Sequence, residues 1–436
     1  MMGLIVLDLS RLLSRAARRV PTGIDRVEHA YAETLLSVAR SRLRYAALHP
    51  LGRFTHLPTA RARQFIERTG YLWQHAMPRS KVDPTFEPVA DAQAPERSAN
   101  GVQGLARRLY AGMMLPHASP RFLRDTNRAR PTYLLVSHHH LHQPHAIETA
   151  KRRLGANFVC FIHDLIPIEL PEYGRPLEAE KHRRRMETAT RLADAIVVNS
   201  AATRDALMPF MRKAGRDVPL LVAPLGVDTR RMELSCTKAT EPYFIYIGTI
   251  EPRKNHLLLF NIWRRLAETM GERTPKLLLV GQRGWENEMV LDVLERSESL
   301  RPHIREFNAL PDIEVASLVR GARALLLPSF AEGYGLPIAE ALSSGTPVLC
   351  SDLPALREVG GNAPEYLDPL DGLGWLAAVS DYTEPASVRR ARQIERIAAW
   401  SPPDWKAHIN AVMTLIGDLS TPGAAGLSEP LRLPAP

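Results

Sequence analysis

Two glutamates, Glu332 and Glu340, stand eight positions apart with the residues Gly-Tyr-Gly-Leu-Pro-Ile-Ala between them. Proline is favoured in the first turn of a helix, so we expect a helix from Pro337. The glycines leave backbone N–H groups unobstructed, and a helix N-terminus carries partial positive charge. Such a turn suits a diphosphate, and the carboxylates can accept hydrogen bonds from sugar hydroxyls. Strand-like runs at 324–329 and 346–351 predict that this turn lies at the carboxyl end of a parallel strand.

Two adjacent cations, Arg253 and Lys254, follow another strand-like run, residues 243–248. Cations near the start of a helix oppose its dipole unless an anion is present. The pair can clamp a leaving diphosphate, a contribution of roughly 3 kcal/mol by analogy with other such clamps. The alternative is a solvated pair of surface charges.

Histidine and glycine supply further candidates in the first half of the chain. His163 ends a strand-like run, and a structural histidine is the alternative to a functional one there. His138, His139 and His140 are consecutive, but no matching carboxylate or cysteine cluster accompanies them, so we expect a polar loop lining a cleft and no metal site. Gly23 follows the helix-capping residue Thr22 and allows close backbone approach to a phosphate or an acceptor.

The composition is that of a globular protein with two or three domains: 436 residues, 45% hydrophobic and 24% charged. No apolar run approaches the roughly 18 residues of a membrane-spanning helix, and the first residues lack the pattern of a secretion signal. Three cysteines, far apart in the sequence, make a disulfide framework improbable. We therefore expect a reducing, cytoplasmic location.

The net charge of +9 comes mostly from arginine. A solvated basic face is the first interpretation, and attraction to an anionic membrane at the inner face of the cell is the second. Aromatic residues make up only 6% and no nucleic-acid motif accompanies the charge, so we expect no nucleic-acid partner. Residues 105–115 are basic and apolar, which fits either a core helix or a helix that lies on the membrane or grips a lipid-linked acceptor.

Both halves of the chain alternate strand-like and helical stretches, the pattern of parallel sheets flanked by helices. We predict an α/β fold of two facing Rossmann-like domains with a ligand cleft between them. The domains are residues 1–230 and 240–418, followed by a disordered tail at 419–436. The strand candidates are 4–9, 43–49, 132–137, 157–163, 195–200 and 220–223 in the first half, and 243–248, 276–281, 323–329 and 347–351 in the second.

Four motifs occur in order in the second half. They are Tyr246-Ile-Gly-Thr-Ile-Glu-Pro-Arg-Lys-Asn255, Val280-Gly-Gln-Arg-Gly-Trp285, Pro328-Ser-Phe-Ala-Glu-Gly-Tyr-Gly-Leu-Pro-Ile-Ala-Glu340 and Gly345-Thr-Pro-Val-Leu-Cys-Ser-Asp-Leu-Pro354. Together they resemble the donor domain of glycosyltransferase family 4, the group 1 glycosyltransferases, whose members have the GT-B fold. The resemblance is strong over residues 243–369 and looser in the first half.

The resemblance implies roles for residues at matching positions. Glu340 matches the glutamate that binds ribose hydroxyls of a sugar nucleotide, and Glu332 the one that faces the transferred sugar. His163 matches a histidine that also faces this sugar. Thr249 stands where many members have an arginine, which leaves Arg253 or a residue of the other domain to supply the second charge. The catalytic candidates are Glu332, His163, Arg253 and Lys254, and the donor-binding candidates are Gly248, Thr249, Tyr334, Gly335, Leu336, Glu340 and Gly23.

The resemblance also implies a retaining hexosyltransferase without an essential metal or cofactor, with a nucleotide diphosphate sugar as donor. The motifs look most like those of mannosyl- and rhamnosyltransferases of surface polysaccharide assembly, which favours GDP-mannose and a growing lipid-linked glycan. Two alternatives are a nucleotide-sugar epimerase of the same architecture, which would need no acceptor, and a non-catalytic relative that binds glycans or partners.

Overall fold

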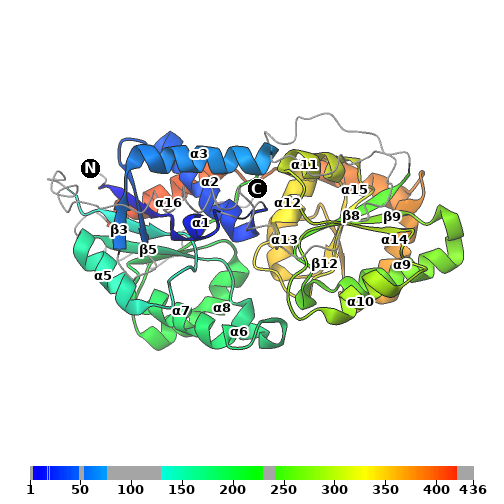
Figure 1. Ribbon diagram of the computed structural model, residues 1–436, viewed down its shortest axis with the longest axis horizontal. Coiled ribbons are helices and arrows are strands. Elements are labelled where there is room, and N and C mark those ends of the chain that lie inside the picture. The colour runs from blue at the N-terminus through cyan, green and yellow to red at the C-terminus, as the bar shows by residue number, and fades with distance from the viewer. Residues whose placement is uncertain are drawn as a thin grey trace. The chain divides into compact units, whose positions relative to one another are not determined.

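The computed structural model describes residues 3–16, 18, 20–48, 54–75, 129–228 and 241–419. The chain divides into two compact units (Figure 1). The described part of unit 1 comprises residues 3–73, 129–226 and 404–419, and that of unit 2 lies within 227–403.

Unit 1 is built on a seven-stranded sheet of order β3-β2-β1-β4-β5-β6-β7. Only the pairing of β3 with β2 is antiparallel among its described strand pairs. The strands are β1 (Ile5–Asp8), β2 (Leu43–Leu48), β3 (Phe54–Leu57), β4 (Thr132–Leu135), β5 (Asn157–Ile162), β6 (Ala195–Val198) and β7 (Leu220–Val222). The central strands are buried along their whole length and mostly apolar because helices cover both of their faces.

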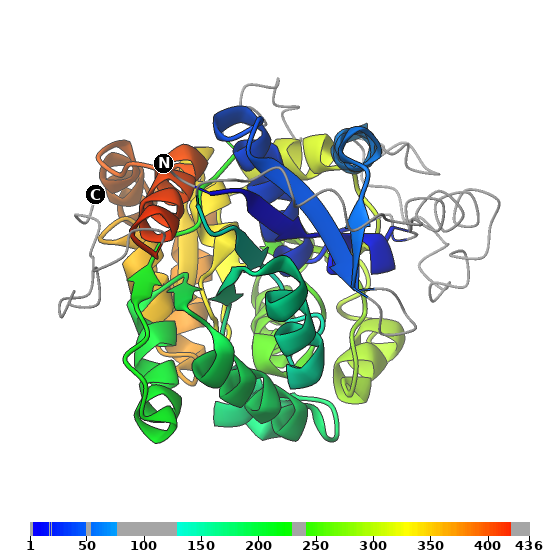
Figure 2. The ribbon, with the colours of Figure 1, turned by 90° about the vertical axis from the view of Figure 1, so that its left-hand side faces the viewer.

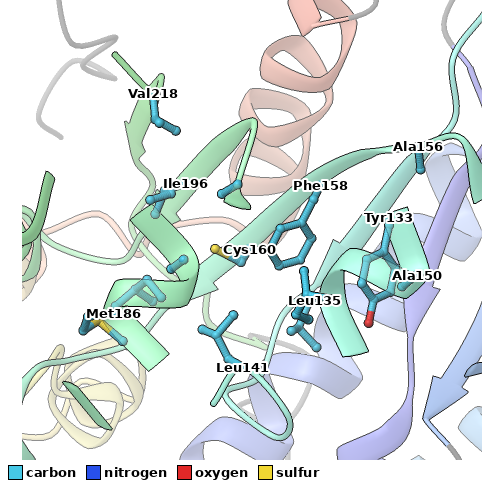
Figure 3. Packing of buried hydrophobic residues seen from close by; sticks show 14 of the residues in the cluster. Tyr133, Leu135, Leu141, Ala150, Ala156, Phe158, Cys160, Met186, Ile196 and Val218 are labelled. Atoms are coloured by element: carbon cyan, nitrogen blue, oxygen red, sulfur yellow. The ribbon is translucent and has the colours of Figure 1, made fainter. Parts of the chain in front are cut away.

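The helices of unit 1 form a layer on each side of the sheet (Figure 2). They are α1 (Ser10–Ser14), α2 (Gly23–Val38), α3 (Thr59–His75), α5 (Pro144–Leu154), α6 (Ile166–Glu169), α7 (Glu178–Leu192), α8 (Ala201–Ala214) and α16 (Trp405–Leu419). Beneath α5 and α7, Phe158 and Cys160 of β5 pack among Leu135 of β4, Ile196 of β6 and Met186 of α7 (Figure 3). This core fixes the strand ends that carry polar side chains.

Unit 2 is built on a six-stranded sheet of order β10-β9-β8-β11-β12-β13, with all pairs parallel. Counted from its own first strand, this is the order 3-2-1-4-5-6 of the Rossmann fold. The strands are β8 (Tyr243–Ile247), β9 (Lys276–Val280), β10 (Ile304–Phe307), β11 (Leu325–Leu327), β12 (Val348–Ser351) and β13 (Glu365–Leu367). The helices are α9 (His256–Met270), α10 (Glu288–Arg296), α11 (Asp312–Gly321), α12 (Leu336–Ser343), α13 (Pro354–Gly360), α14 (Gly372–Thr383) and α15 (Val388–Ala398).

The prediction of two Rossmann-like domains is confirmed, and every strand expected from an apolar run is present. Three strands were missed: β3, β10 and β13. They contain only three or four residues each and include polar side chains, because each lies at the edge of its sheet. Edge strands do not need the continuous apolar run that marks a buried parallel strand.

The predicted end of the second domain at residue 418 is wrong, because the last helix, α16, belongs to unit 1. Its apolar face packs against α2, and His408 hydrogen-bonds both the Tyr31 hydroxyl (2.5 Å) and the Pro224 carbonyl (2.9 Å). Gly226 permits the return, since a Cβ atom there would lie 2.1 Å from the backbone nitrogen of Trp405. The tail expected from residue 419 falls, beyond Leu419, outside the described residues.

Candidate functional site

The strand order of unit 2 reverses between β8 and β11, which are neighbours in the sheet. Ligands of open α/β sheets bind beyond the carboxyl ends of the strands at such a reversal. The loop after β8 carries Gly248, Thr249, Arg253 and Lys254, and the loop after β11 leads to Glu332. The candidate residues of the second half therefore meet at the edge where this fold binds ligands.

The first of these loops is held close to the end of β9. Gly248 has φ +151°, a backbone conformation that favours glycine. A Cβ atom on Gly281 would lie 1.9 Å from the Gly248 carbonyl oxygen, so the two backbones touch where side chains would not fit.

Glu332 and the two cations form one buried cluster. The Glu332 carboxylate accepts hydrogen bonds from Lys254 Nζ, from Arg253 Nη1 (3.1 Å) and from Ser329 Oγ (2.7 Å). Arg253 also pairs with Glu251, at 2.7 Å. Both predicted cations thus bind the predicted carboxylate, Glu332, and Ser329 and Glu251 belong to the same cluster.

The environment keeps Glu332 ionised. Only 9% of each side chain of Glu332 and Lys254 is exposed. Burial alone would raise the pKa of Glu332, but Lys254 and Arg253 outweigh it and lower the pKa to about 2. Burial and the charge of Arg253 lower the pKa of Lys254, while Glu332 opposes that shift. Two carboxylates, Glu332 and Glu251, accompany the two cations. A bound anion therefore has to compete with these carboxylates for Arg253 and Lys254.

Helix α12 begins at this edge, one residue before the predicted Pro337. Gly335 precedes the helix with φ +101°, and a Cβ atom there would lie 2.6 Å from Leu356 Cδ2, so both backbone and packing require glycine. Tyr334 is buried, and Glu340 lies half-buried one turn inside the helix. The helix therefore starts directly after the glycine turn, as predicted, and Glu332 and Glu340 lie on either side of that start.

A second polar cluster lies at the corresponding reversal of unit 1, between β1 and β4. Asp8, the last residue of β1, accepts hydrogen bonds from the Ser10 backbone N–H and from the Tyr133 hydroxyl, both at 2.9 Å. The same hydroxyl lies 2.8 Å from His140 Nε2. Because Asp8 can only accept, Tyr133 donates to Asp8 and accepts from His140.

Glu28 of α2 is buried beside this cluster. One carboxyl oxygen accepts from the Leu12 backbone N–H at 3.4 Å, and the other is buried with no hydrogen-bond partner in the described residues. Burial and, next, the charge of Asp8 raise the pKa of Glu28 to about 8. Glu28 is therefore protonated at neutral pH.

Gly23, the predicted glycine of unit 1, is the exposed first residue of α2. A Cβ atom there would meet no atom within 4 Å, so packing does not require glycine at this position. Thr22 and Asp25 form a capping box before it, and Asp25 also pairs with Arg11 at 2.6 Å.

His163 directly follows β5 and is buried. Its Nε2 hydrogen-bonds the Val136 carbonyl at 2.7 Å, so this nitrogen carries the proton. Burial lowers the pKa of His163 to about 4, which keeps the ring neutral. His163 is thus held in one tautomer, with Nδ1 as its acceptor atom.

In the loop of three histidines, which we predicted to be a polar loop lining a cleft, His138 and His140 are buried. The His138 ring meets the rings of His163 and His182 edge-on, with centroids 5.2 and 5.1 Å apart. The His163 backbone N–H donates to His138 Nε2 at 3.2 Å, and the Tyr133 hydroxyl bonds His140 Nε2, so both buried rings have hydrogen-bond partners. Across the described residues, no three His, Cys, Asp or Glu side chains are placed to hold a metal ion together.

Sequence reasoning missed Ser329, Glu251, Asp8, Tyr133 and Glu28. Some signals existed in the sequence: Asp8 is the charge that ends an apolar run, and Ser329 is the second residue of the motif that contains Glu332 and Glu340. The basic segment 105–115 and Cys236 lie outside the described residues. Among the helices that are described, none combines the length and apolar character needed to cross a bilayer.

Comparisons with known proteins match both halves of the chain. The family model described as "Glycosyl transferases group 1" matches residues 234–365, and that described as "Glycosyltransferase Family 4" matches residues 84–231. The first of these includes the loops after β8 and β11 and most of unit 2.

Similar curated proteins include O-antigen chain mannosyltransferase B of Escherichia coli, 33% identical over 52% of this chain and 59% of the relative. O-antigen chain mannosyltransferase RfbU of Salmonella typhimurium is 30% identical over 35% of this chain and 42% of the relative. The chain thus spans about half the length of these two relatives.

Solved structures share the fold over almost the whole chain. Sucrose-phosphate synthase of Thermosynechococcus elongatus has a TM-score of 0.62 at 15% identity, covering 96% of this chain and 99% of that one. HepE of Anabaena, solved in complex with UDP, has a TM-score of 0.59 at 14% identity, covering 95% of this chain and 100% of that one.

Proposed function

The chain belongs to glycosyltransferase family 4, the group 1 glycosyltransferases, and on that premise we propose that it transfers a hexose from a nucleotide diphosphate sugar to a polysaccharide acceptor. The favoured donor is GDP-mannose, and the favoured acceptor is a growing, lipid-linked surface polysaccharide met at an anionic membrane. Relatives named as O-antigen chain mannosyltransferases support the choice of mannose and of a polysaccharide. Transfer proceeds with retention of anomeric configuration and without a metal ion.

The observation that carries the proposal is the cluster of Glu332, Lys254 and Arg253 at the strand reversal of unit 2. A site for a diphosphate needs cations near a helix N-terminus, and α12 begins four residues after Glu332. A site for a sugar needs acceptors for its hydroxyls, and carboxylates provide them.

The leaving diphosphate takes Lys254 and Arg253 as its partners. Glu332 binds both of these cations in the structure, so the oxygen atoms of the diphosphate replace the carboxylate oxygen atoms of Glu332. Glu332, relieved of its cations, then accepts hydrogen bonds from the sugar. The cations lower the barrier because they already lie where negative charge develops on the leaving group.

The acceptor hydroxyl attacks on the face from which the diphosphate leaves, through an oxocarbenium-like state, and a phosphate oxygen takes its proton. His163 acts as a neutral partner that accepts a hydrogen bond at Nδ1, because its Nε2–H is engaged with Val136. Its low pKa rules out a role as a proton donor near neutral pH.

Thermal unfolding with GDP, UDP, ADP and dTDP, each with a chelator present, tests the donor site. A ligand at 100 times its dissociation constant stabilises the fold by about 2.7 kcal/mol. We expect a shift with GDP alone, and a loss of affinity in Glu340→Ala. No shift with any diphosphate would favour the non-catalytic alternative.

The reaction is tested with GDP-mannose and a lipid-linked oligosaccharide, with product configuration read by NMR coupling constants. We expect an α-linked product only when the acceptor is present. Conversion of the sugar nucleotide without acceptor would identify an epimerase instead. A β-linked product would exclude retention.

A further inference from the structure

Unit 2 has a second hollow, of about 660 Å³, away from the strand reversal. It opens beside the edge strand β13 and is bounded by α13, α14 and α15. Strand β12 separates β13 from β11, so this hollow is distinct from the candidate donor site. Its lining includes Arg357, Arg389, Arg392, Arg396, Glu365 and Asp381.

The lining has an excess of positive charge: four arginines face two carboxylates. Both carboxylates are engaged, since Glu365 pairs with Arg389 and Asp381 accepts a hydrogen bond from Ser387 Oγ. Arg392 has no hydrogen-bond or ion-pair partner in the part of the chain that the structure describes. Arg357 and Arg389 are paired with carboxylates, so the guanidinium groups of Arg392 and Arg396 remain open to a ligand.

Three of the four arginines, Arg357, Arg389 and Arg396, are held in place by contacts within unit 2. Arg357 pairs with Asp352 and lies over the Tyr366 ring, 4.4 Å from its centroid. Arg396 Nε donates to the Asn362 carbonyl at 2.9 Å, which leaves its terminal nitrogen atoms for other acceptors.

Helix α15, which carries three of these arginines, is anchored on its inner side. Buried Gln393 donates to the carbonyls of Val348 (2.7 Å) and Ala363 (3.1 Å), and Ser387 caps the helix. A fixed helix lowers the entropic cost of presenting its side chains to a ligand.

We propose that this hollow is a second ligand site that binds a phosphate ester. A phosphate monoester carries a charge of about −1.5 to −2 near pH 7, and Arg392 and Arg396 can both bind to it. Its several oxygen atoms can accept from guanidinium groups that converge from different elements, whereas a carboxylate offers only one planar pair. Val388 of α15, which lines the hollow and is 63% exposed, provides apolar surface for the organic part of the ester.

The same chemistry occurs in two sources, a soluble phosphate ester and the head group of a phospholipid. Calorimetry with glycerol 3-phosphate tests the first. Co-sedimentation with vesicles of phosphatidic acid and phosphatidylcholine at 3:7, against pure phosphatidylcholine, tests the second. The variant is Arg392→Glu, and the control is Arg265→Glu, an equal charge change on the exposed surface of α9.

We expect Arg392→Glu to weaken binding of at least one probe about tenfold or more, while Arg265→Glu changes it less than twofold. Binding to vesicles without binding of glycerol 3-phosphate identifies a phospholipid head group as the ligand. Binding of glycerol 3-phosphate without binding to vesicles identifies a soluble ester. The proposal is overturned if neither probe binds, or if both variants lose affinity equally. The shift of unfolding by a nucleoside diphosphate should be unchanged in Arg392→Glu, so a failure here is distinct from a failure of the donor site.

Discussion

The two sheets reverse their strand order in the same way but treat charge at that point in opposite ways. In unit 2, the cations Lys254 and Arg253 are paired with the carboxylates Glu332 and Glu251. In unit 1, Glu28 is buried protonated and the nearby histidines are buried neutral. Equivalent topology therefore does not fix the protonation state, which depends on whether counter-ions accompany the buried groups.

The difference matches two kinds of ligand. An ionic cluster can exchange its internal partners for a charged group such as a diphosphate. A network in which Glu28 and the histidines are neutral suits hydroxyl groups, which bring no charge to compensate. Within the proposed function, unit 2 would take the donor and unit 1 the acceptor.

Removal of Glu332 should have the largest effect on stability. Glu332→Ala leaves Lys254 buried without its nearest counter-ion, and we expect a loss of about 3–5 kcal/mol in the free energy of unfolding. Denaturant unfolding followed by the fluorescence of Trp263 and Trp375 in unit 2 measures it. A nucleoside diphosphate should stabilise this variant more than the wild type.

The matched control is Glu295→Ala, which removes a more exposed carboxylate paired with Arg283. We expect a loss below about 1 kcal/mol there, because exposed pairs contribute little. Equal losses in both variants would contradict the view that the cluster is held by buried charges.

Lys254→Ala should mainly lower turnover, by about 100-fold, which corresponds to roughly 3 kcal/mol of transition-state stabilisation. Initial rates with the active donor measure it, with Lys276→Ala, whose side chain pairs with Glu241, as the control. A change confined to KM would mean that Lys254 binds donor and transition state equally.

Glu28→Gln tests the neutral cluster. The folded-state pKa of about 8 lies above the ordinary 4.5, so the unfolded state loses its proton first and wild-type stability falls as pH rises from 4.5 to 8. Glutamine has no such proton to lose. We expect the variant to gain about 2 kcal/mol or more relative to wild type between pH 5 and pH 8, measured by denaturant unfolding. A difference independent of pH would show that Glu28 is ionised in the folded protein.

Tyr133→Phe should have the smallest effect, a loss of about 1–2 kcal/mol, because Asp8 and His140 each lose one buried hydrogen bond. Thermal unfolding measures it, and Tyr71→Phe, at an exposed tyrosine of α3, is the control. No loss would indicate that water replaces the hydroxyl.

Much of this arrangement could be predicted from the sequence. The fold followed from continuous apolar runs such as Asn157–Ile162, and the unit 2 site from glycines and charges at the ends of such runs. The contact of Lys254 with Glu332 could not be predicted, because 78 positions separate the two residues and the sequence pattern does not show which charges pair. The same holds for Tyr133 and Asp8, which are 125 positions apart.

The placement of helix α16 in unit 1 could not be predicted from the sequence either. Its buried residues Ile409, Val412 and Ile416 give an amphipathic pattern that predicts a packed helix. The pattern does not say which sheet the helix covers. Here the close approach of Gly226 to Trp405 and the bonds of His408 decide it.

The return of α16 to unit 1 also sets an order on biosynthesis. Residues 227–403, which contain the sheet of unit 2 and the helices that cover it, leave the ribosome before α16 does. At about 5–20 residues per second, translating this stretch of about 180 residues takes roughly 10–35 s. During that time α2 lacks the helix that covers Tyr31, so nascent unit 1 presents apolar surface to chaperones until the last segment arrives.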